Sequence, residues 1–272
     1  MQNFQLEVFL HIIGIGAASG LVFTQNELFL ISDSSSYLYN YSFEDEKLNK
    51  IALIENASEN IPKKEKPDFE SITLFNNQLY IFGSGSSENR NALYIYNLKN
   101  ETVKERNIKI QHDSLKIKSG ISAEDFNIEG VVYHQNKTLL FQRGNGKGGK
   151  NGVFILDEQK KEVRYQQIDL PKINGVAATF TDAVLVSNTI YFLASAENSN
   201  STFDDGEVMG SIIGSLTPES LEINFTQKIS DTHKFEGITF FRKQDTILEF
   251  LLCEDNDSDV LESTIYKLTL HQ

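Results

Sequence analysis

The sequence predicts an all-β fold, a five-bladed β-propeller of four-stranded antiparallel blades, and three observations support this class. Pairs of alternating apolar strands, separated by two to four polar residues, recur along the whole chain. The small or acidic residues that open the five pairs are 51, 59, 53 and 54 residues apart, namely Ser19, Glu70, Glu129, Asp182 and Glu236. Helix signals are scarce, with one helical turn expected around residues 114–125. A regular repeat of about this length, with four strands, is typical of a propeller blade.

Each repeat predicts its strands in chain order. The first and second strands are expected at residues 19–24 with 27–31, 70–75 with 78–82, 129–134 with 137–141, 182–186 with 189–193, and 236–241 with 246–252. Third strands such as 92–96 and 152–156 follow, and then fourth strands such as 102–110 and 162–170. The fifth repeat ends with its third strand at 263–270. The unassigned N-terminal strand 4–13 is therefore expected to complete that blade and close the ring.

This pattern predicts one propeller domain over residues 1–272. Its blades are expected at about 14–54, 68–110, 125–170, 179–229 and 233–272, with strand 4–13 added to the last. The chain is 40% hydrophobic and contains 19 Phe and 10 Tyr, enough for a sizeable core, which excludes a disordered protein. Cys253 is the single cysteine, so an internal disulfide and a thiolate metal cluster are excluded, and we expect it to be buried and inert.

The charge balance limits the partners. The chain has 25 Lys and Arg against 38 Asp and Glu, a net charge of −13, which disfavours phosphate backbones and anionic lipid surfaces. No apolar run reaches the ~20 residues of a membrane span, and the apolar stretch 8–18 follows acidic Glu7 instead of a basic segment. We expect a cytoplasmic location and a small-molecule ligand, with no nucleic-acid or membrane partner. Protein partners are left open.

One face of the predicted ring collects the polar chemistry. In a blade the first strand lines the central channel, and its start shares a face with the end of the antiparallel second strand. The five opening residues lie on that face together with long polar loops at 83–90, 143–151, 197–207 and 254–259. The connections on the opposite face are short hairpins with simple turn chemistry. Function is therefore expected on the first face.

The five opening residues predict a metal site. Ser19, Glu70, Glu129, Asp182 and Glu236 would converge on one channel, where close carboxylates repel each other unless a cation lies between them. Calcium accepts six to eight oxygen ligands with flexible geometry, which suits side chains from five blades better than octahedral magnesium does. The alternative is a hydrated acidic channel in which these side chains bind no metal.

The same column resembles that of the calcium-activated nucleotidase (apyrase) family across all five repeats. The local motifs Glu70-Ser, Glu129-Gly-Val and Phe235-Glu-Gly-Ile are similar as well. The resemblance implies a five-bladed propeller with a calcium ion in its central channel, held in the order Ser, Glu, Glu, Ser, Glu. Either Thr181 or Asp182 would replace the second Ser and still supply an oxygen. The substrate-binding loops of that family have no match here, so the fold and metal carry over better than the activity.

Two other resemblances involve shorter motifs. The sequences Lys66-Pro-Asp-Phe-Glu-Ser, Gly83-Ser-Gly-Ser-Ser with Arg90, Thr181-Asp-Ala and Asp205-Gly-Glu-Val-Met-Gly-Ser resemble an uncharacterised group of bacterial propeller proteins. That group implies no activity. The Glu-Gly-Ile/Val motif alone is similar to phytase-like esterase and phytase propellers, which generally have six blades.

Two loops suggest a phosphate ligand beside the metal. The loop 83–87 with Arg90 offers backbone N–H groups, the hydroxyls of Ser84 and Ser86 and a guanidinium. The loop 143–151 concentrates positive charge in Arg143, Lys147 and Lys150. The alternative is that the first loop is a plain turn and that the lysines are solvated. We assign Arg90, Arg143, Ser84, Ser86 and Lys147 as candidate substrate-binding residues.

Two functional hypotheses follow, from different classes. The first is a calcium-dependent hydrolase of a phosphorylated small molecule, with Glu197, Glu254 or Asp255 as candidate base and Arg143 or Arg90 neutralising developing charge. The second is a noncatalytic propeller in which calcium clamps the blades while the loop face binds a ligand or protein. Other motifs are excluded: the chain has no Gly-x-Ser-x-Gly elbow, and its histidines lack ligand spacing. Asp255-x-Asp257-x-Asp259 is interpreted as an acidic surface loop because it lacks the later residues of a calcium loop.

Overall fold

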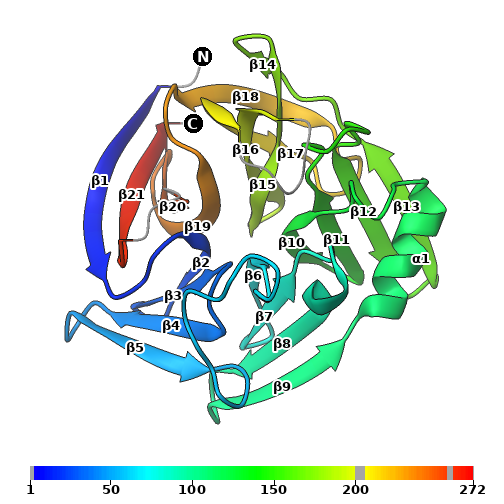
Figure 1. Cartoon of the computed structure of the whole chain (residues 1–272). Coiled ribbons are helices and arrows are strands. Elements are labelled where there is room, and N and C mark those ends of the chain that lie inside the picture. The colour runs from blue at the N-terminus through cyan, green and yellow to red at the C-terminus, as the bar shows by residue number, and fades with distance from the viewer. Residues whose placement is uncertain (1–2, 200–205, 256–259, 272) are drawn as a thin grey trace.

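The protein is a five-bladed β-propeller, as its computed structural model shows (Figure 1). The structure describes residues 3–199, 206–255 and 260–271. The first two blades are β2 (Ala18–Thr24), β3 (Glu27–Ser32), β4 (Tyr37–Ser42) and β5 (Lys47–Ala52), then β6 (Phe69–Phe75), β7 (Gln78–Gly83), β8 (Ala92–Asn97) and β9 (Thr102–Asn107). The third is β10 (Ile128–His134), β11 (Lys137–Gln142), β12 (Gly152–Asp157) and β13 (Glu162–Gln167). Neighbouring strands within each blade are antiparallel.

The last two blades complete the ring. Blade four contains β15 (Val176–Val186), β16 (Thr189–Asn198), β17 (Glu207–Leu216) and β18 (Ile223–Ser230), with the two-residue β14 (Lys172–Ile173) added beside β15. Blade five contains β19 (Phe235–Gln244), β20 (Ile247–Glu254) and β21 (Glu262–His271), and β1 (Phe4–Ile13) is its outer strand. The pairing of β1 with β21 is antiparallel, from Phe4 opposite Leu270 to Ile13 opposite Glu262. The predicted closure by the N-terminal strand is confirmed, and no seam is left between the first and last blades.

The hydrophobic core lies between the blades. The described residues form five apolar clusters, and each joins two neighbouring blades around the ring. The alternation of apolar and polar residues along each strand gives it two such faces, one toward each neighbour. Cys253 belongs to the cluster between blades five and one and is fully buried, and burial raises the pKa of its thiol. Its expected burial is confirmed.

The helix lies earlier in the chain than the sequence analysis placed it. Helix α1 spans Lys109–Ser119, and β9 ends at Asn107 instead of continuing to residue 110. The Asn107 side chain accepts a hydrogen bond from the Lys109 N–H, 2.9 Å away, at the start of the helix. Gly120 adopts the left-handed conformation at the end, with φ 63°, and donates its N–H to Lys116. No helix among the described residues is long and apolar enough to span a membrane.

Closure of the ring predicts unequal roles for two adjacent residues of β1. The Ile12 side chain is 1% exposed in the cluster between blades five and one, whereas Ile13 is 79% exposed. We expect Ile12→Ala to lower the free energy of unfolding by about 2–4 kcal/mol, because it leaves a cavity. Ile13→Ala should cost less than about 1 kcal/mol. Equilibrium urea unfolding measures both, and equal losses would show that β1 does not pack as described.

Candidate functional site

A β-bulge in every inner strand builds the centre of the site. The register of each inner strand with its partner shifts at one residue in the channel-ward part of the strand, and these residues are Ser19, Glu70, Glu129, Thr181 and Glu236; β19 has a second shift between Phe240 and Arg242. A bulged residue is left out of the ladder, and its side chain is turned relative to its neighbours. The same irregularity in five blades directs five side chains to one end of the channel. We call these five residues the channel ring.

Thr181, and not Asp182, occupies the fourth position of the channel ring. The register shift lies between Phe180 and Asp182, so Thr181 is the extra residue. The Asp182 carboxylate instead accepts backbone N–H groups from Ala183 at 2.7 Å and Ile238 at 2.8 Å. It therefore ties blade four to blade five. Asp182, the other residue that the sequence offered for this position, lies one residue beyond the bulge, which residue counting alone does not locate.

The two hydroxyls of the ring connect neighbouring blades. Ser19 Oγ donates to the carbonyl of Phe69 at 2.5 Å, and Thr181 Oγ1 donates to the carbonyl of Phe235 at 2.7 Å. Each acceptor directly precedes a ring glutamate of the next blade. A hydroxyl that donates its proton keeps its oxygen lone pairs for another partner.

Glycine follows three of the ring residues for a steric reason. A Cβ at Gly237 would lie 2.9 Å from the Cα of Gly20, and one at Gly130 would lie 3.0 Å from the nitrogen of Ala183. Inner strands of neighbouring blades thus approach each other closely just after the bulge. The Glu-Gly motif recognised in the sequence therefore combines a ring carboxylate with the close approach that a narrow channel needs.

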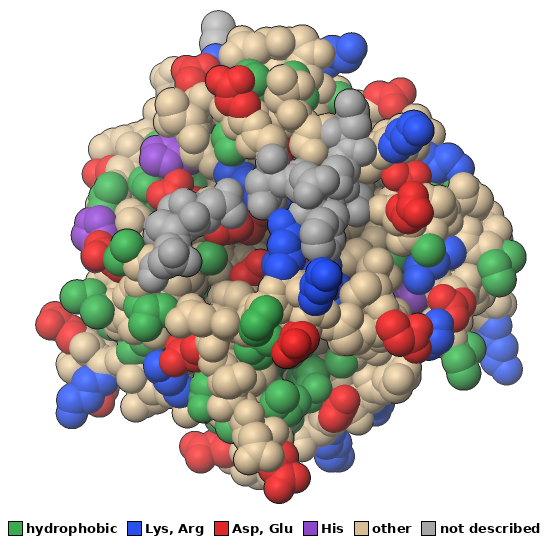
Figure 2. All heavy atoms as spheres, viewed as in Figure 1, with side chains coloured by type: hydrophobic (Ala, Val, Ile, Leu, Met, Phe, Trp, Pro, Cys, Tyr) green, Lys and Arg blue, Asp and Glu red, His purple; other side chains and the backbone are tan. Residues whose placement is uncertain are grey.

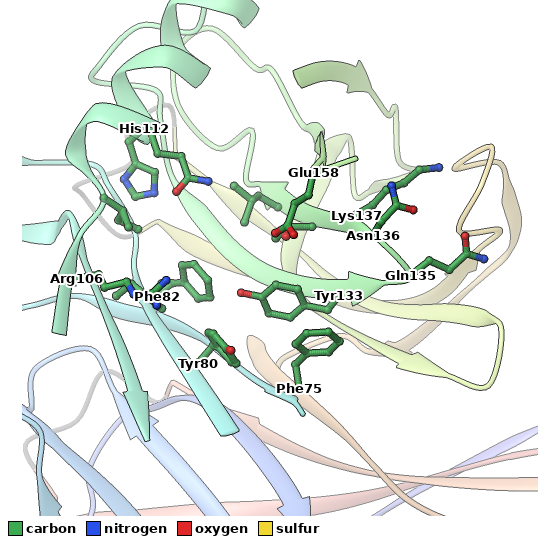
Figure 3. A pocket seen from close by; sticks show the side chains of 15 residues that line it. Phe75, Tyr80, Phe82, Arg106, His112, Tyr133, Gln135, Asn136, Lys137 and Glu158 are labelled. Carbon is green, nitrogen blue, oxygen red and sulfur yellow. The ribbon is translucent and has the colours of Figure 1, made fainter. Parts of the chain in front are cut away.

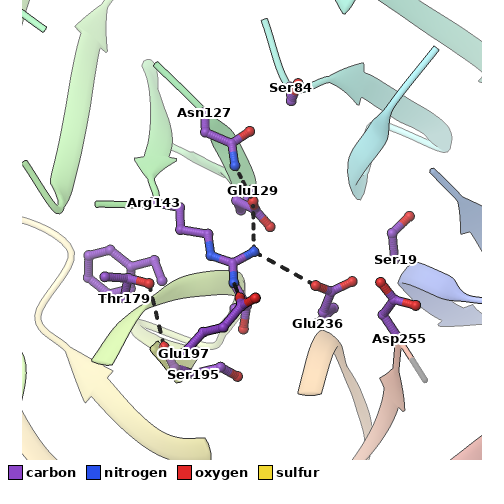
Figure 4. Close-up of polar contacts among 12 residues, drawn as sticks. Ser19, Ser84, Asn127, Glu129, Arg143, Thr179, Ser195, Glu197, Glu236 and Asp255 are labelled. Carbon is purple, nitrogen blue, oxygen red and sulfur yellow. Dashed lines mark hydrogen bonds and ion pairs between the residues drawn. The ribbon is translucent and has the colours of Figure 1, made fainter. Parts of the chain in front are cut away.

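Arg143 lies at the centre of the charged network and is 5% exposed (Figure 4). Its guanidinium contacts Glu197 at 2.7 Å and Glu129 at 3.3 Å, and lies 3.8 Å from Glu236. Asn127 Nδ2 donates to the same Glu129 oxygen, Oε1, at 2.5 Å. The other oxygen, Oε2, is buried and has no hydrogen-bond partner among the described residues. Glu129 thus keeps one unsatisfied carboxylate oxygen within the site.

Two lysines neutralise further carboxylates. Lys234 Nζ lies 3.0 Å from Glu236 and 3.7 Å from Asp255, and its side chain is 6% exposed. Lys66 contacts Asp33 and lies 3.0 Å from Asp68. Asp33, Asp68 and Glu70 bring one carboxylate oxygen each within 4.8 Å of one another. Because Lys66 already contacts two of these three, their cation is an ammonium group of the same chain. Figure 2 shows acidic and basic side chains beside each other at the centre of this face.

Sequence reasoning missed these two lysines, together with Asp33, Asp68 and Asn127. The sequence does contain a spacing pattern that could have indicated several of these residues. Lys66, Asp68 and Glu70 alternate, as do Asn127 with Glu129 and Lys234 with Glu236. In extended chain, residues two apart share a face, although at Asp68 the backbone is left-handed, with φ 54°. Asp33 lies at the end of the second strand of the neighbouring blade. Alternation within one segment therefore does not predict that Asp33 contacts these residues.

Burial and mutual repulsion change the acidity of the ring glutamates. Burial, with the charges of Glu129 and Asp68, raises the pKa of Glu70 well above its ordinary value. Burial also raises the pKa of Glu129 despite Arg143. For Glu236, burial and the nearby Asp255 outweigh Lys234 and raise the pKa to about 8. Without another cation, these groups bind protons more readily at neutral pH than exposed glutamates do.

The loop expected to bind phosphate binds a carboxylate of its own chain. Arg90 NH1 donates to Asp68 Oδ2 at 2.8 Å, and Ser84 Oγ donates to the same oxygen at 2.5 Å. Ser86 Oγ lies 3.5 Å from it and accepts from Arg90. These donors do form an anion site, but Asp68 occupies it. Sequence alone did not place Asp68 there, and the assignment of Arg90, Ser84 and Ser86 to substrate stays a prediction.

The basic loop 143–151 separates into different roles. Arg143 belongs to the charged network, Lys147 is exposed, and Lys150 donates to the carbonyls of Ser119 and Gly120 at the end of α1. The positive charge of this loop does not form a single cluster. Lys150 binds carbonyl groups at the C-terminal end of α1, and Arg143 binds carboxylates of the channel.

The three candidate bases lie on the channel face, and each has a charged or hydrogen-bonding partner. Glu197 contacts Arg143 and accepts the N–H of Gly206 at 2.6 Å. Glu254 accepts the hydroxyl of Tyr266 at 2.5 Å, and its other oxygen lies 2.6 Å from His233 Nδ1. Asp255 lies near Lys234, and Asp257 and Asp259 fall outside the described residues.

The other end of the channel is apolar. A cavity of about 360 Å³ opens there, lined by the later residues of all five inner strands. Its lining includes Leu21, Ile72, Val132, Ala183 and Ile238. The channel therefore has a charged end and a mainly apolar end, and the ring carboxylates lie at the first.

Comparisons with known proteins identify the family. This is a β-propeller protein with a charged channel, and residues 14–270 match a family of unknown function, DUF6929. The chain belongs to that family. No curated protein matches it.

Solved structures share the fold at low sequence identity. The Malassezia sympodialis allergen Mala s 1 has a TM-score of 0.56, 11% identity and 95% coverage of each chain. Myxococcus xanthus glutaminyl cyclase has a TM-score of 0.53 and 11% identity over 98% of this chain and 97% of its own. A streptogramin B lyase is similar at a TM-score of 0.48 and 11% identity, covering 99% and 98%. The first two similarities support the propeller fold and nothing further.

The raised pKa of Glu236 predicts how stability depends on pH in chelator-treated protein. The folded protein holds a proton on Glu236 up to about pH 8, whereas the unfolded chain releases it near the ordinary value of 4.5. Unfolding therefore releases a proton between these values, and the free energy of unfolding should fall as pH rises from 4.5 to 8. We expect Glu236→Gln to make this slope shallower. Urea unfolding at four pH values with EDTA tests it, and an unchanged slope would contradict the assignment.

Proposed function

We propose that the protein is a calcium-binding propeller whose channel ion joins the five blades and whose charged face binds a small molecule. The observation that carries this proposal is the Oε2 atom of Glu129, which is buried without a partner although Glu129 is 2% exposed. A buried unsatisfied carboxylate oxygen costs free energy unless a proton or cation reaches it. Figure 4 shows Glu129, Glu236 and Ser19 around the same central space.

The chemistry of the channel ring fits a hard cation. Glu70, Glu129 and Glu236 would supply carboxylate oxygens, and the hydroxyls of Ser19 and Thr181 keep lone pairs after donating to Phe69 and Phe235. This mixture of charged and neutral oxygens suits Ca²⁺ and its flexible geometry. Asn127 and Arg143 hold the other Glu129 oxygen, which fixes the orientation of the carboxylate. When bound, the ion would supply positive charge that offsets the repulsion among the three carboxylates.

The noncatalytic function has the stronger structural support. Glu197, Glu254 and Asp255 are all engaged with cations or hydrogen-bond donors of the same chain, so none of them stands as an unengaged base beside the channel ring. The donors near Arg90 are occupied by Asp68. We therefore infer that calcium acts as a clamp and that the charged face binds a small molecule without turnover.

A calcium-dependent hydrolase of phosphorylated small molecules, similar to a nucleotidase or phytase, is the second candidate. What favours it is Arg143, which lies between the channel ring and Glu197. In that position its guanidinium would stabilise negative charge on a phosphoryl oxygen, and Glu197 would accept a proton from water.

Calcium-dependent thermal unfolding tests the proposed ring. Binding to the folded state alone stabilises it by RT ln(1 + [Ca²⁺]/Kd), about 2.7 kcal/mol at 100 times Kd. We expect Tm to rise with calcium in the wild type and not in Glu129→Gln. The matched control Glu162→Gln, at an exposed position on β13, should keep the full shift. A wild-type protein that does not respond, or a Glu129→Gln variant that still does, would contradict calcium binding by the ring.

A phosphate-release screen on nucleotides and sugar phosphates separates the two functions. For the clamp we expect no calcium-dependent release. Release that falls by about 10²-fold or more in Glu197→Gln, with the calcium shift in Tm retained, would instead establish the hydrolase.

A further inference from the structure

A second cavity lies between blades two and three, away from the charged end of the channel (Figure 3). Its volume is about 340 Å³, within the range of small-molecule sites. Strands β7 and β8 contribute from one blade, β10 and β11 from the next, and α1 closes one end. Phe82, Leu93 and Leu140 are buried in its lining. The cavity interrupts an interface between blades that is otherwise filled with apolar side chains.

Three aromatic rings form one wall. Phe75 and Tyr133 are stacked, with centroids 4.6 Å apart and planes at 20°, and Tyr80 lies 5.1 Å from Tyr133 in a tilted arrangement. Because Phe75 covers one face of the Tyr133 ring, the opposite face is the one that can receive a ligand. Figure 3 places Glu158 and Asn136 on that side of the ring. Burial raises the pKa of Tyr133, with contributions from Tyr80 and Glu158, so its hydroxyl remains a donor.

Polar side chains form the opposite wall and the rim. Arg106, Gln111 and Glu158 line the cavity from exposed positions, and their side chains make no hydrogen bond or ion pair with the described part of the chain. They supply donors, acceptors and both signs of charge. Asn136, in contrast, already donates to Asp157 at 2.7 Å. A ligand would thus meet an aromatic surface on one side and unengaged hydrogen-bonding groups on the other.

We propose that this cavity, which we call the interblade site, binds a neutral saccharide. A pyranose ring has one face of weakly positive C–H groups, which lies favourably on the negative face of an aromatic ring, and hydroxyls around its edge. Tyr133 would contact the C–H face, while Glu158, Gln111 and Arg106 bind the hydroxyls.

Other ligand classes fit the interblade site less well. A fatty chain would leave the polar wall unpaired, which is unfavourable for the groups it desolvates. A phosphate would meet the Glu158 carboxylate on a chain of net charge −13. A flat nucleobase would stack on Tyr133 but offers fewer groups at its edge than a sugar, so it serves as the competing ligand in the test.

Saturation-transfer difference NMR with methyl β-glucoside, maltose and cellobiose tests the site, with adenosine as competitor. We expect signals from the sugar ring protons and a Kd of about 1 mM for a monosaccharide, from its roughly twelve heavy atoms at ordinary ligand efficiency. Tyr133→Phe keeps the stack and removes the hydroxyl, so Kd should rise about 2- to 10-fold. The double variant Gln111→Ala with Glu158→Ala, at exposed positions, should weaken binding by about tenfold or more.

Control variants separate this site from the channel. Lys118→Ala with Glu162→Ala changes exposed residues of α1 and β13 outside the cavity and should leave Kd unchanged, as should Glu129→Gln in the channel ring. Absence of signal for every saccharide, an unchanged Kd in the Gln111/Glu158 double variant, or binding of adenosine in place of the sugars would each overturn the proposal. Because the thermal test of calcium involves other residues, either site can fail without the other.

Discussion

Repulsion among carboxylates on the propeller axis is the constraint on which the rest of this structure depends. Five blades with the same bulge bring Glu70, Glu129 and Glu236 to one end of the channel. Burial increases the repulsion, because little water lies between the charges. Each carboxylate then needs a proton, an ammonium or guanidinium group, or a metal ion. The surrounding loops supply the guanidinium of Arg143 and the ammonium group of Lys234 to ring glutamates, and Lys66 contacts the neighbouring Asp68.

These buried cations make the loops part of the fold. Removing one partner of a buried ion pair commonly costs 3–5 kcal/mol, because the other charge remains without compensation. Arg143 enters from the end of β11, and Glu197 from the end of β16, so their contact joins two blades. The Asp68 carboxylate accepts hydrogen bonds from Arg90 and Ser84, and these bonds connect the segment before β6 to the loop after β7. The polar face is therefore a network built by several blades.

The fold was predictable because the sequence repeats two signals at once, alternation within strands and a period of 51 to 59 residues between opening residues. The missing fourth strand of the fifth repeat predicted the outer position of strand 4–13. The ring glutamates were predictable because they recur in register. The contacts of Arg143 with its carboxylate partners were not, since which oxygen meets which nitrogen depends on side-chain orientations that the sequence does not specify. Asp182 illustrates the limit: a shift of one residue at Thr181 turns it from the ring toward the backbone of Ile238.

The two proposed sites follow from how propeller blades pack. Inner strands approach each other closely at Gly130 and Gly237, where an added Cβ would lie 3.0 Å or less from the backbone of the neighbouring inner strand. Between blades two and three, Phe75, Tyr80 and Tyr133 cluster against one another and leave a cavity beside them. The proposed metal site on the axis and the proposed ligand site between blades are compatible, because they involve different residues: the first would connect the inner strands, and the second would occupy a gap between two blades.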